Sequence, residues 1–456
     1  MPIDVTTVQS DGWWAKRLWE KLAARRPRAE LLWAYYSGRP PLPEGAQQMR
    51  ESYQAFQRKA RTNYAELIVE APQQRMIPQG FRTGAEGDDN GDAAARAIWM
   101  GNGLDVESAE VHRAMLTTGD AYVIVGHDGT SPIITAESPT QVITEHDPVR
   151  QRKVIAALKS FHDPLLGEEF LYLYLPGRVV VARRSVSAVK DLGTFQPARW
   201  DWDEDLSKEF AHDVVPVVRF RNKGGVGEFE PHLDHLDRIN HMLLQRLVVA
   251  TSQAFRQRGI KGNLPERDEA GNLIDYDKVF SADPGALWEL PDGIDVWESQ
   301  QTSFQDMLAS VRDDVKDLAA VTFTPLHYFT PDAASGSAEG AALAREGLVF
   351  KTEDRIARVK DAWAQVMSLA FRFAGDTQRS ELASLEAIFA SPERHSLAER
   401  YDAATKAQSV GVPWETIMSE ILQYSPEAVR QMLAKRGQDL IFQVTAPAAI
   451  PAAPRG

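Results

Sequence analysis

Three histidines on one predicted helix are the residues of this sequence whose type and spacing best suit metal chemistry. His232 and His235 lie one helical turn apart, so both imidazoles can face the same side, and Asp234 and Asp237 are nearby. His241 comes six residues after His235, on a different face, so no third ligand is aligned with the pair. The cluster leaves open a metal-dependent nuclease or hydrolase as the alternative function, and a polar helix face is the simpler interpretation.

Other signatures of catalysis are missing from the sequence. No G-x-x-x-x-G-K-[ST] phosphate-binding loop occurs, and the glycines at 224, 225 and 227 lack the dinucleotide-binding spacing. Ser335, Ser337 and Gly340 do not have the spacing of a nucleophile elbow. The chain has no cysteine, which excludes disulfides, thiolate catalysis and cysteine-based metal sites. We therefore expect neither an enzyme nor a cofactor.

The charge balance argues against a protein that grips nucleic acid over its whole surface. Among 456 residues, Lys and Arg total 51 against 64 Asp and Glu, a net charge of −13. One basic stretch, from Lys16 to Arg28, is interleaved with Trp residues and leaves nucleic-acid contact open. An amphipathic surface helix is the favoured interpretation of this stretch. No apolar run reaches 18 residues, so no membrane span or membrane partner is expected.

The first half of the chain predicts helices followed by an antiparallel sheet. Residues up to about 37 indicate a pair of helices separated at Pro27, and helical patterns return at 63–70 and 91–119. Strand patterns then continue to about residue 222. Asp128-Gly129 and Pro176-Gly177 suit the tight turns of two hairpins in that region.

The second half predicts long helices around an acidic excursion. Residues 231–258 form the clearest helix, about 42 Å long at 1.5 Å per residue, and 303–321 form a second. Between them, residues 259–302 carry ten acidic and three basic side chains, a net charge of −7. Short strands at 273–274, 286–290 and 295–297 suit this excursion better than helix. The remaining predictions are an aromatic loop at 322–340, a long helix from Ala341 to about Ala374, short helices over 380–438, and a disordered Pro/Ala-rich tail at 446–456.

Two long helices that bracket an excursion leave apolar stripes without cover. Copies of the same chain arranged in a closed ring would cover them, so the sequence predicts a symmetric oligomer.

This order of parts resembles the portal proteins of tailed double-stranded DNA bacteriophages. The resemblance is carried by the ordered set of short motifs over about residues 12–440, none of them catalytic. The motifs are Tyr35-Tyr36-Ser37-Gly38-Arg39-Pro40-Pro41-Leu42-Pro43, Asn63 to Glu70, Gly80-Phe81-Arg82, Gly119-Asp120-Ala121-Tyr122-Val123, Pro231 to Asn240, Thr324-Pro325 with Ser335-Gly336-Ser337-Ala338, and Gly411-Val412-Pro413-Trp414.

The resemblance implies an α+β, portal-like fold with a mixed α/β wing, long stem helices, a small β-rich clip, a long central helix and a helical crown. The implied boundaries are 1–229 for the wing, 230–258 and 303–321 for the stem helices, 259–302 for the clip, 322–340 for the tunnel-loop region, 341–375 for the central helix, 376–445 for the crown and 446–456 for a disordered tail.

The resemblance also implies a function. Such a protein forms a ring-shaped channel at a capsid vertex, a head–tail connector of usually twelve subunits through which double-stranded DNA is packaged and ejected. Its expected partners are the terminase packaging motor, a head-completion adaptor, and the major capsid and scaffolding proteins. It would be assembled in the host cytoplasm and reside in the virion. A structural or scaffold protein without an axial channel is a third interpretation.

Two sets of site residues follow from the resemblance. Phe323, His327, Tyr328 and Phe329 would belong to the tunnel loop, facing DNA or a neighbouring subunit, with core packing as the simpler alternative. Asp268, Glu269, Asp275 and Asp277 would form the docking surface of the clip. No catalytic, cofactor or metal residue is expected.

Overall fold

The computed structural model of the chain describes residues 3–41, 51–85, 91–185, 193–254, 258–262, 264–267, 271, 273–276, 295–298, 304–330 and 338–445. The chain divides into two compact units, and each is described by itself below. We call the larger unit the body; it comprises Met1–Ser37, Asn63–Pro231 and Thr322–Gly456. We call the smaller unit the helix-pair unit; it comprises Gly38–Thr62 and His232–Val321. Helices and antiparallel strands occur in separate stretches of the chain, so the α+β prediction is confirmed.

The N-terminal helix α1 (Asp11–Tyr36) is one continuous helix, which corrects the predicted helix pair. Pro27 lies inside it and removes one backbone hydrogen bond, a local cost of about 3 kcal/mol. The helix continues because apolar residues on both sides of the proline, among them Leu22 and Leu32, are fully buried. Tertiary packing of one face therefore outweighs the local effect of Pro27.

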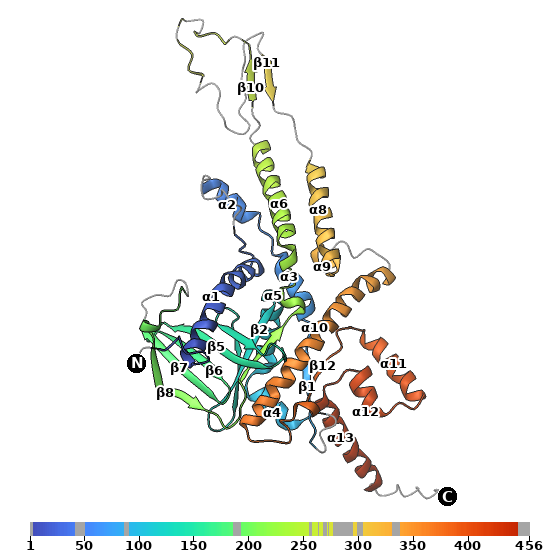
Figure 1. Cartoon of the computed structure of the whole chain (residues 1–456). Coiled ribbons are helices and arrows are strands. Elements are labelled where there is room, and N and C mark those ends of the chain that lie inside the picture. The colour runs from blue at the N-terminus through green and yellow to red at the C-terminus, as the bar shows by residue number, and fades with distance from the viewer. Residues whose placement is uncertain are drawn as a thin grey trace, which may run out of the picture. The chain divides into compact units, whose positions relative to one another are not determined.

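A five-stranded antiparallel sheet supports α1. Its order is β4-β5-β6-β7-β8, and Figure 1 shows α1 lying along this sheet. Trp19 of α1 packs against Phe195 and Trp200, with ring centroids 5.9 and 5.4 Å apart, above the buried leucines of β5 and β6. The strands are β4 (Val142–His146), β5 (Val154–Asp163), β6 (Glu168–Leu175), β7 (Arg178–Ser185) and β8 (Asp201–Glu209).

A second, three-stranded sheet lies between two helices of the body. Its order is β3-β2-β9, and all pairs are antiparallel. The long helix α10 (Ala338–Phe373) contacts this sheet, and fully buried Trp363 packs against Phe220 with ring centroids 4.9 Å apart. The other elements are β2 (Asp120–His127), β3 (Pro132–Glu137), β9 (Val217–Arg221), α3 (Tyr64–Gln73), α4 (Ala93–Gly101) and α5 (Leu104–Thr118).

Both predicted hairpins are confirmed. Gly129, between β2 and β3, and Gly177, between β6 and β7, have φ of 98° and 78°, which favours glycine over any residue with a side chain. α10 begins at Ala338, three residues earlier than expected, so Gly340 lies inside the helix.

The C-terminal part of the body contains a strand that the sequence pattern did not predict. β12 (Glu386–Phe389) pairs antiparallel with β1 (Pro78–Arg82), about 300 residues away in the chain. The expected short helices follow it. They are α11 (Leu397–Ser409), α12 (Trp414–Thr416), a π-helical turn at Ile417–Ile421, and α13 (Pro426–Thr445). A further short helix, α9 (Leu326–Phe329), lies before α10, within the predicted aromatic loop. The predicted tail at 446–456 lies outside the described residues.

The helix-pair unit contains the two long helices predicted around the excursion. α6 (Leu233–Ala254) packs against α8 (Phe304–Val321), and Arg238 Nη2 lies 3.0 Å from Asp314 Oδ1. The short helix α2 (Glu51–Lys59) contacts α6, and Thr62 donates two hydrogen bonds of 2.9 Å to Asn240.

α6 ends earlier than the sequence pattern suggested. Arg258, predicted as the last residue of that helix, starts strand β10 (Arg258–Lys261) instead, which pairs with β11 (Asp295–Glu298). Gly259 and Gly262 weaken any continuation of the helix. The strand predicted at 295–297 is confirmed, whereas 286–290 lies outside the described residues. No helix in the described part of the chain is long and apolar enough to cross a membrane.

Candidate channel-loop site

The segment that follows α8 forms a short, tightly held structure in the body. Thr322 and Thr324 are both buried, and their hydroxyl oxygens lie 3.1 Å apart in a hydrogen bond. Phe323, between them, has a left-handed backbone with φ of 52°, and its side chain is 61 % exposed. A bulky residue in this region is strained by about 1–3 kcal/mol. The two buried threonines thus hold Phe323 outward.

The four predicted tunnel-loop residues do not share one environment. Phe329 is buried against Tyr64, with ring centroids 5.2 Å apart. The Tyr328 hydroxyl accepts a hydrogen bond of 3.2 Å from Arg75, and its ring lies 4.8 Å from the His327 ring. Phe323 is the most exposed of the four. That any of the four faces DNA or a neighbouring subunit stays a prediction, and Phe323 is the best placed for such a contact because its side chain is exposed.

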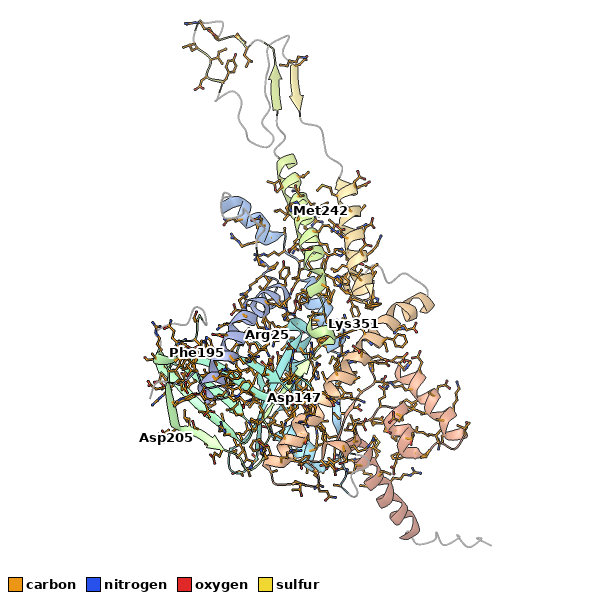
Figure 2. All side chains as sticks on the ribbon, in the orientation of Figure 1. Arg25, Asp147, Phe195, Asp205, Met242 and Lys351 are labelled. Atoms are coloured by element: carbon orange, nitrogen blue, oxygen red, sulfur yellow. The ribbon has the colours of Figure 1, made fainter. Side chains whose placement is uncertain are left out.

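Beneath this segment lies a cluster of buried charges, which we call the Glu228 cluster: Glu228, Lys351 and Arg355, with Asn222. Glu228 Oε2 lies 2.8 Å from Lys351 Nζ, and Oε1 lies 2.6 Å from Arg355 Nε. Asn222 Nδ2 donates a 3.0 Å hydrogen bond to the same carboxylate. The Glu228 and Lys351 side chains are only 4 % and 7 % exposed. Figure 2 shows where Lys351 projects from α10.

The electrostatics of the Glu228 cluster favour the ionised form of Glu228. Burial alone would raise the pKa of Glu228, but Lys351 and Arg355 outweigh it and lower that pKa to about 2. Burial lowers the pKa of Lys351, and the charge of Glu228 opposes that effect. Each charge therefore depends on its partner, because an unpaired ion at this depth is costly.

The Glu228 cluster holds the two connections between the body and the long helices α6 and α8. Glu228 lies three residues before Pro231, the last body residue before α6, and Lys351 Nζ also donates a 3.0 Å hydrogen bond to the carbonyl of Thr322, the first body residue after α8. Both connections are thereby fixed to the same turn of α10. The contacts hold the geometry of this junction.

The loop that carries Glu228 is held closely against the end of α5. The Glu228 amide donates a 2.8 Å hydrogen bond to the carbonyl of Leu116. A Cβ on Gly227 would lie 2.2 Å from the carbonyl oxygen of Thr117, so no larger residue fits there. Arg28 of α1 reinforces the loop, with Nε 2.6 Å from Glu230 Oε1.

Sequence reasoning missed the Glu228 cluster. A usable signal existed on α10, where Lys351 and Arg355 follow each other at four-residue spacing beside the apolar positions Leu348 and Ile356. Cations next to a buried stripe either extend to solvent or pair with a buried anion. Nothing local identified Glu228 as that anion, because it lies more than 120 residues earlier in the chain.

The histidine cluster does not form a metal site. His235 Nε2 lies 2.9 Å from the carbonyl oxygen of Asp314, and His241 is 3.3 Å from Gln245. Across the residues that the structure describes, no group of three His, Cys, Asp or Glu side chains could hold a metal ion. The nuclease or hydrolase that was the alternative function therefore has no support.

The structure describes one of the four predicted clip residues. Asp275 is described and exposed. Asp268, Glu269 and Asp277 lie outside the described residues, so the docking surface of the clip stays a prediction.

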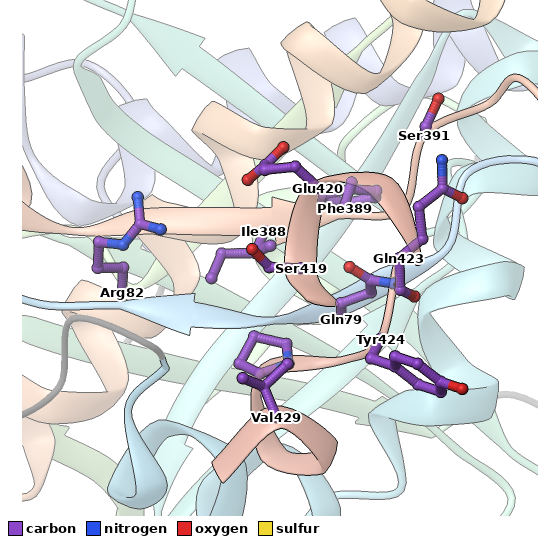
Figure 3. A pocket seen from close by; sticks show the side chains of 11 residues that line it. Gln79, Arg82, Ile388, Phe389, Ser391, Ser419, Glu420, Gln423, Tyr424 and Val429 are labelled. Atoms are coloured by element: carbon purple, nitrogen blue, oxygen red, sulfur yellow. The ribbon is translucent and has the colours of Figure 1, made fainter. Parts of the chain in front are cut away.

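Cavities in the body are small. One of about 100 Å³ lies between the β1–β12 ribbon and the segment from the π-helical turn to α13, where Gln79 and Gln423 lie close together (Figure 3). Gln79 Nε2 donates a 3.3 Å hydrogen bond to the Gln423 carbonyl. Another of about 170 Å³ lies beside α10. Both are smaller than the roughly 300–1,000 Å³ of ordinary substrate pockets.

Comparisons with known proteins match most of the chain to phage portal proteins. The model of the family described as "Phage portal protein, SPP1 Gp6-like" matches residues 15–439. The portal protein of Mycobacterium phage L5 is 27% identical over 404 residues, covering 83% of this chain and 78% of that protein. The portal protein of Mycobacterium phage D29 is 27% identical over 378 residues, covering 77% and 73%. A solved structure titled "Neck of empty GTA particle computed with C6 symmetry" has a TM-score of 0.45 at 13% identity, covering 87% of this chain and 93% of that one.

Proposed function

The chain belongs to the SPP1 Gp6-like family of phage portal proteins and forms a channel at a capsid vertex of the virion, and from this premise we propose that twelve copies build the ring. The role is structural. Twelve helices spaced about 10 Å apart give a circle roughly 38 Å across between helix axes. Removing one helix diameter of about 10 Å leaves a bore of about 28 Å, wide enough for hydrated duplex DNA.

The observation that carries this proposal is the distribution of apolar residues on α6. Seven of the nine residues from Met242 to Ala250 are apolar, and at 100° per residue they occupy about 260° of the helix circumference. One packed neighbour covers far less than that. Met242, labelled on α6 in Figure 2, is half-buried, as are Leu247 and Val249, although α8 packs on α6. Neighbouring copies in a ring would cover the remaining faces.

We propose that the acidic balance of the chain lets DNA slide. Lys and Arg clusters along a channel would bind phosphates by releasing counterions, and binding would slow translocation. A net charge of −13 per chain avoids such binding. Of the predicted tunnel-loop residues, Phe323 is our candidate for a contact with DNA or a neighbouring copy, because its side chain is exposed.

The domain assignment remains that of the family resemblance: a wing at 1–229, stem helices at 230–258 and 303–321, a clip at 259–302, a tunnel-loop region at 322–340, a central helix at 341–375 and a crown at 376–445. We propose that the clip docks the terminase motor during packaging and the head-completion adaptor afterwards, and that capsid and scaffolding proteins contact the wing during assembly in the host cytoplasm.

Two experiments test these proposals. Native mass spectrometry of the purified assembly should count twelve chains of 50.8 kDa, and any other stable number would contradict the dodecamer. Reversing the charges at Asp268, Glu269, Asp275 and Asp277 together should abolish co-purification with the motor or adaptor while rings persist. Control reversals at Asp402 and Glu415, two exposed acidic residues of the body, should leave motor and adaptor binding unchanged. Unchanged motor and adaptor binding by the clip variant would refute the docking role.

A further inference from the structure

Two exposed patches in the body carry opposite charges beside apolar side chains. The acidic patch consists of Phe323, Glu346, Phe350 and Glu353. Phe323 and Phe350 are each 61 % exposed, and both glutamates are exposed. Residues 346, 350 and 353 share one face of α10 by helical spacing. The Phe323 ring belongs to the same surface, because its Cδ1 would lie 3.3 Å from a Cβ on Gly347.

The acidic patch is held rigidly. Phe323 keeps its left-handed backbone because Thr322 and Thr324 are buried on either side and Lys351 binds the Thr322 carbonyl. Gly347 leaves room for the ring at a helix position where alanine would be more stable by about 1 kcal/mol. Rigid, exposed aromatic side chains lose little freedom on binding, which favours their use as anchors in an interface.

The basic patch consists of Arg221, Lys223 and Val226, in the loop between β9 and α6. Both cations are exposed, and Val226 is 38 % exposed. Neither cation forms an ion pair with any residue that the structure describes, and the same holds for Glu346 and Glu353. Asn222 fixes this loop, because its amide donates hydrogen bonds to Val226 O (2.8 Å) and to Glu228.

The acidic patch and the anchor of the basic-patch loop lie on different sides of α10. The loop of the basic patch is anchored through Glu228 to Arg355, and Phe350 lies five residues before Arg355. Five residues correspond to a rotation of about 140° around the helix. A ring of identical chains needs two different, complementary patches on nearly opposite sides of each copy, because every contact joins the front of one chain to the back of the next.

We propose that the acidic patch of one chain binds the basic patch of the next chain in the ring. Glu346 and Glu353 pair with Arg221 and Lys223 of the neighbour, and the two phenylalanines cover its Val226. This inference rests on the proposed ring. The occupant is a second copy rather than DNA, because two carboxylates flank the aromatic rings and repel phosphate.

Charge-reversed variants test this contact. Glu346→Lys with Glu353→Lys makes both patches positive, and Arg221→Glu with Lys223→Glu makes both negative. Each double variant alone should remain a 50.8 kDa species in mass photometry, with at least a tenfold drop in the ring fraction. An equimolar mixture should restore rings in which the two variants alternate, because every contact then joins opposite charges.

The outcomes separate this inference from the function. If either double variant assembles alone as well as wild type, or if the mixture fails to assemble, the proposed contact is wrong. If wild type itself stays monomeric, the proposed ring fails, and this inference fails with it. Circular dichroism should show unchanged helix content in both variants, because all four substituted side chains are exposed. The wild-type contact should weaken as salt rises, because its ion pairs are screened. Phe350→Ser should weaken assembly in the same assay but keep the same salt dependence, because it removes only an apolar side chain.

Discussion

The Glu228 cluster in the body and residues 242–250 of α6 in the helix-pair unit differ in which side chains are buried and which stay exposed to solvent. In the body, three charged side chains are buried and each has a partner within 2.8 Å. On α6, the apolar side chains from Met242 to Ala250 retain solvent contact, apart from buried Leu244, although a neighbouring helix is present. The buried charges of the Glu228 cluster are paired within one chain, whereas α6 has apolar surface that α8 leaves partly exposed. The comparison implies that buried charges in the body are paired within one chain, whereas the apolar faces of α6 depend on other copies.

The largest expected effect is on assembly. Leu247→Asp combined with Val248→Asp places two charges on half-buried apolar positions of α6 away from the side that carries His235 and Arg238, which contact α8, and burying them unpaired in a ring is prohibitive. We expect rings to disappear in size-exclusion chromatography with light scattering while the chain stays folded. Thr251→Asp, at an exposed polar position of the same helix, is the control and should assemble. Rings of normal size from the double variant would show that α6 does not form the interface.

The next effect is on the stability of the body. Glu228→Gln keeps the side-chain size but leaves Lys351 and Arg355 buried without an anion, which should lower the free energy of unfolding by about 3–5 kcal/mol. Urea unfolding at fixed protein concentration measures this change. Glu386→Gln, whose side chain is 54 % exposed in its pair with Arg82, should cost less than about 1 kcal/mol. Equal effects of the two substitutions would contradict the difference between buried and exposed pairs.

The difference in the free energy of unfolding between wild type and Glu228→Gln should depend on pH. The pKa of Glu228 is about 2 in the folded chain, below its ordinary value of 4.5. A lowered pKa stabilises the fold above the ordinary pKa, and this contribution is lost as pH falls from about 5 to about 2. The stability difference between wild type and Glu228→Gln should therefore narrow over that range. A difference that stays constant from pH 7 to pH 2.5 would exclude Glu228 as the charged centre.

A smaller acid effect comes from His112. Burial lowers its pKa to about 3, and Trp363 Nε1 donates a 2.9 Å hydrogen bond to its Nε2. The unfolded chain gains a proton below about pH 6.5 and the folded chain does not, so stability falls as pH drops from 6.5 toward 3. At pH 5 this loss is about 2 kcal/mol, and His112→Gln should remove it. An unchanged slope of stability against pH between 6.5 and 4.5 would contradict a neutral, buried imidazole.

The smallest effect concerns α11, an exposed part of the body. Ser396 caps this helix by accepting a 3.2 Å hydrogen bond from the Glu399 amide, and Glu399 bonds back to the Ser396 amide at 2.8 Å. Ser396→Ala should cost about 1 kcal/mol in urea unfolding. Ring assembly should be unaffected, because the change is confined to one helix end. A loss of rings would place α11 in the assembly interface.

Local patterns predicted the parts of the fold that local physics determines. Asp128-Gly129 and Pro176-Gly177 set hairpin turns through their backbone preferences, and the apolar periodicity of 231–258 placed α6. Pro27 was misjudged because tertiary packing of α1 outweighs the lost hydrogen bond.

Long-range pairings escaped prediction for a different reason. β12 is four residues long and exists because it pairs with β1, about 300 residues earlier. Lys351 and Glu228 are likewise distant in sequence, and neither residue alone signals the other. The tunnel-loop residues were identified as a segment, but their separation into buried Phe329 and exposed Phe323 depends on packing against Tyr64 and Gly347.

Negative-stain electron microscopy of the purified full chain, imaged over a range of concentrations, tests the central claim most directly. The account predicts ring-shaped views with an axial opening, from particles of about 610 kDa if twelve chains of 50.8 kDa assemble. Particles that stay at the size of a single chain at every concentration would show that the apolar faces of α6 need no neighbour, and would contradict it.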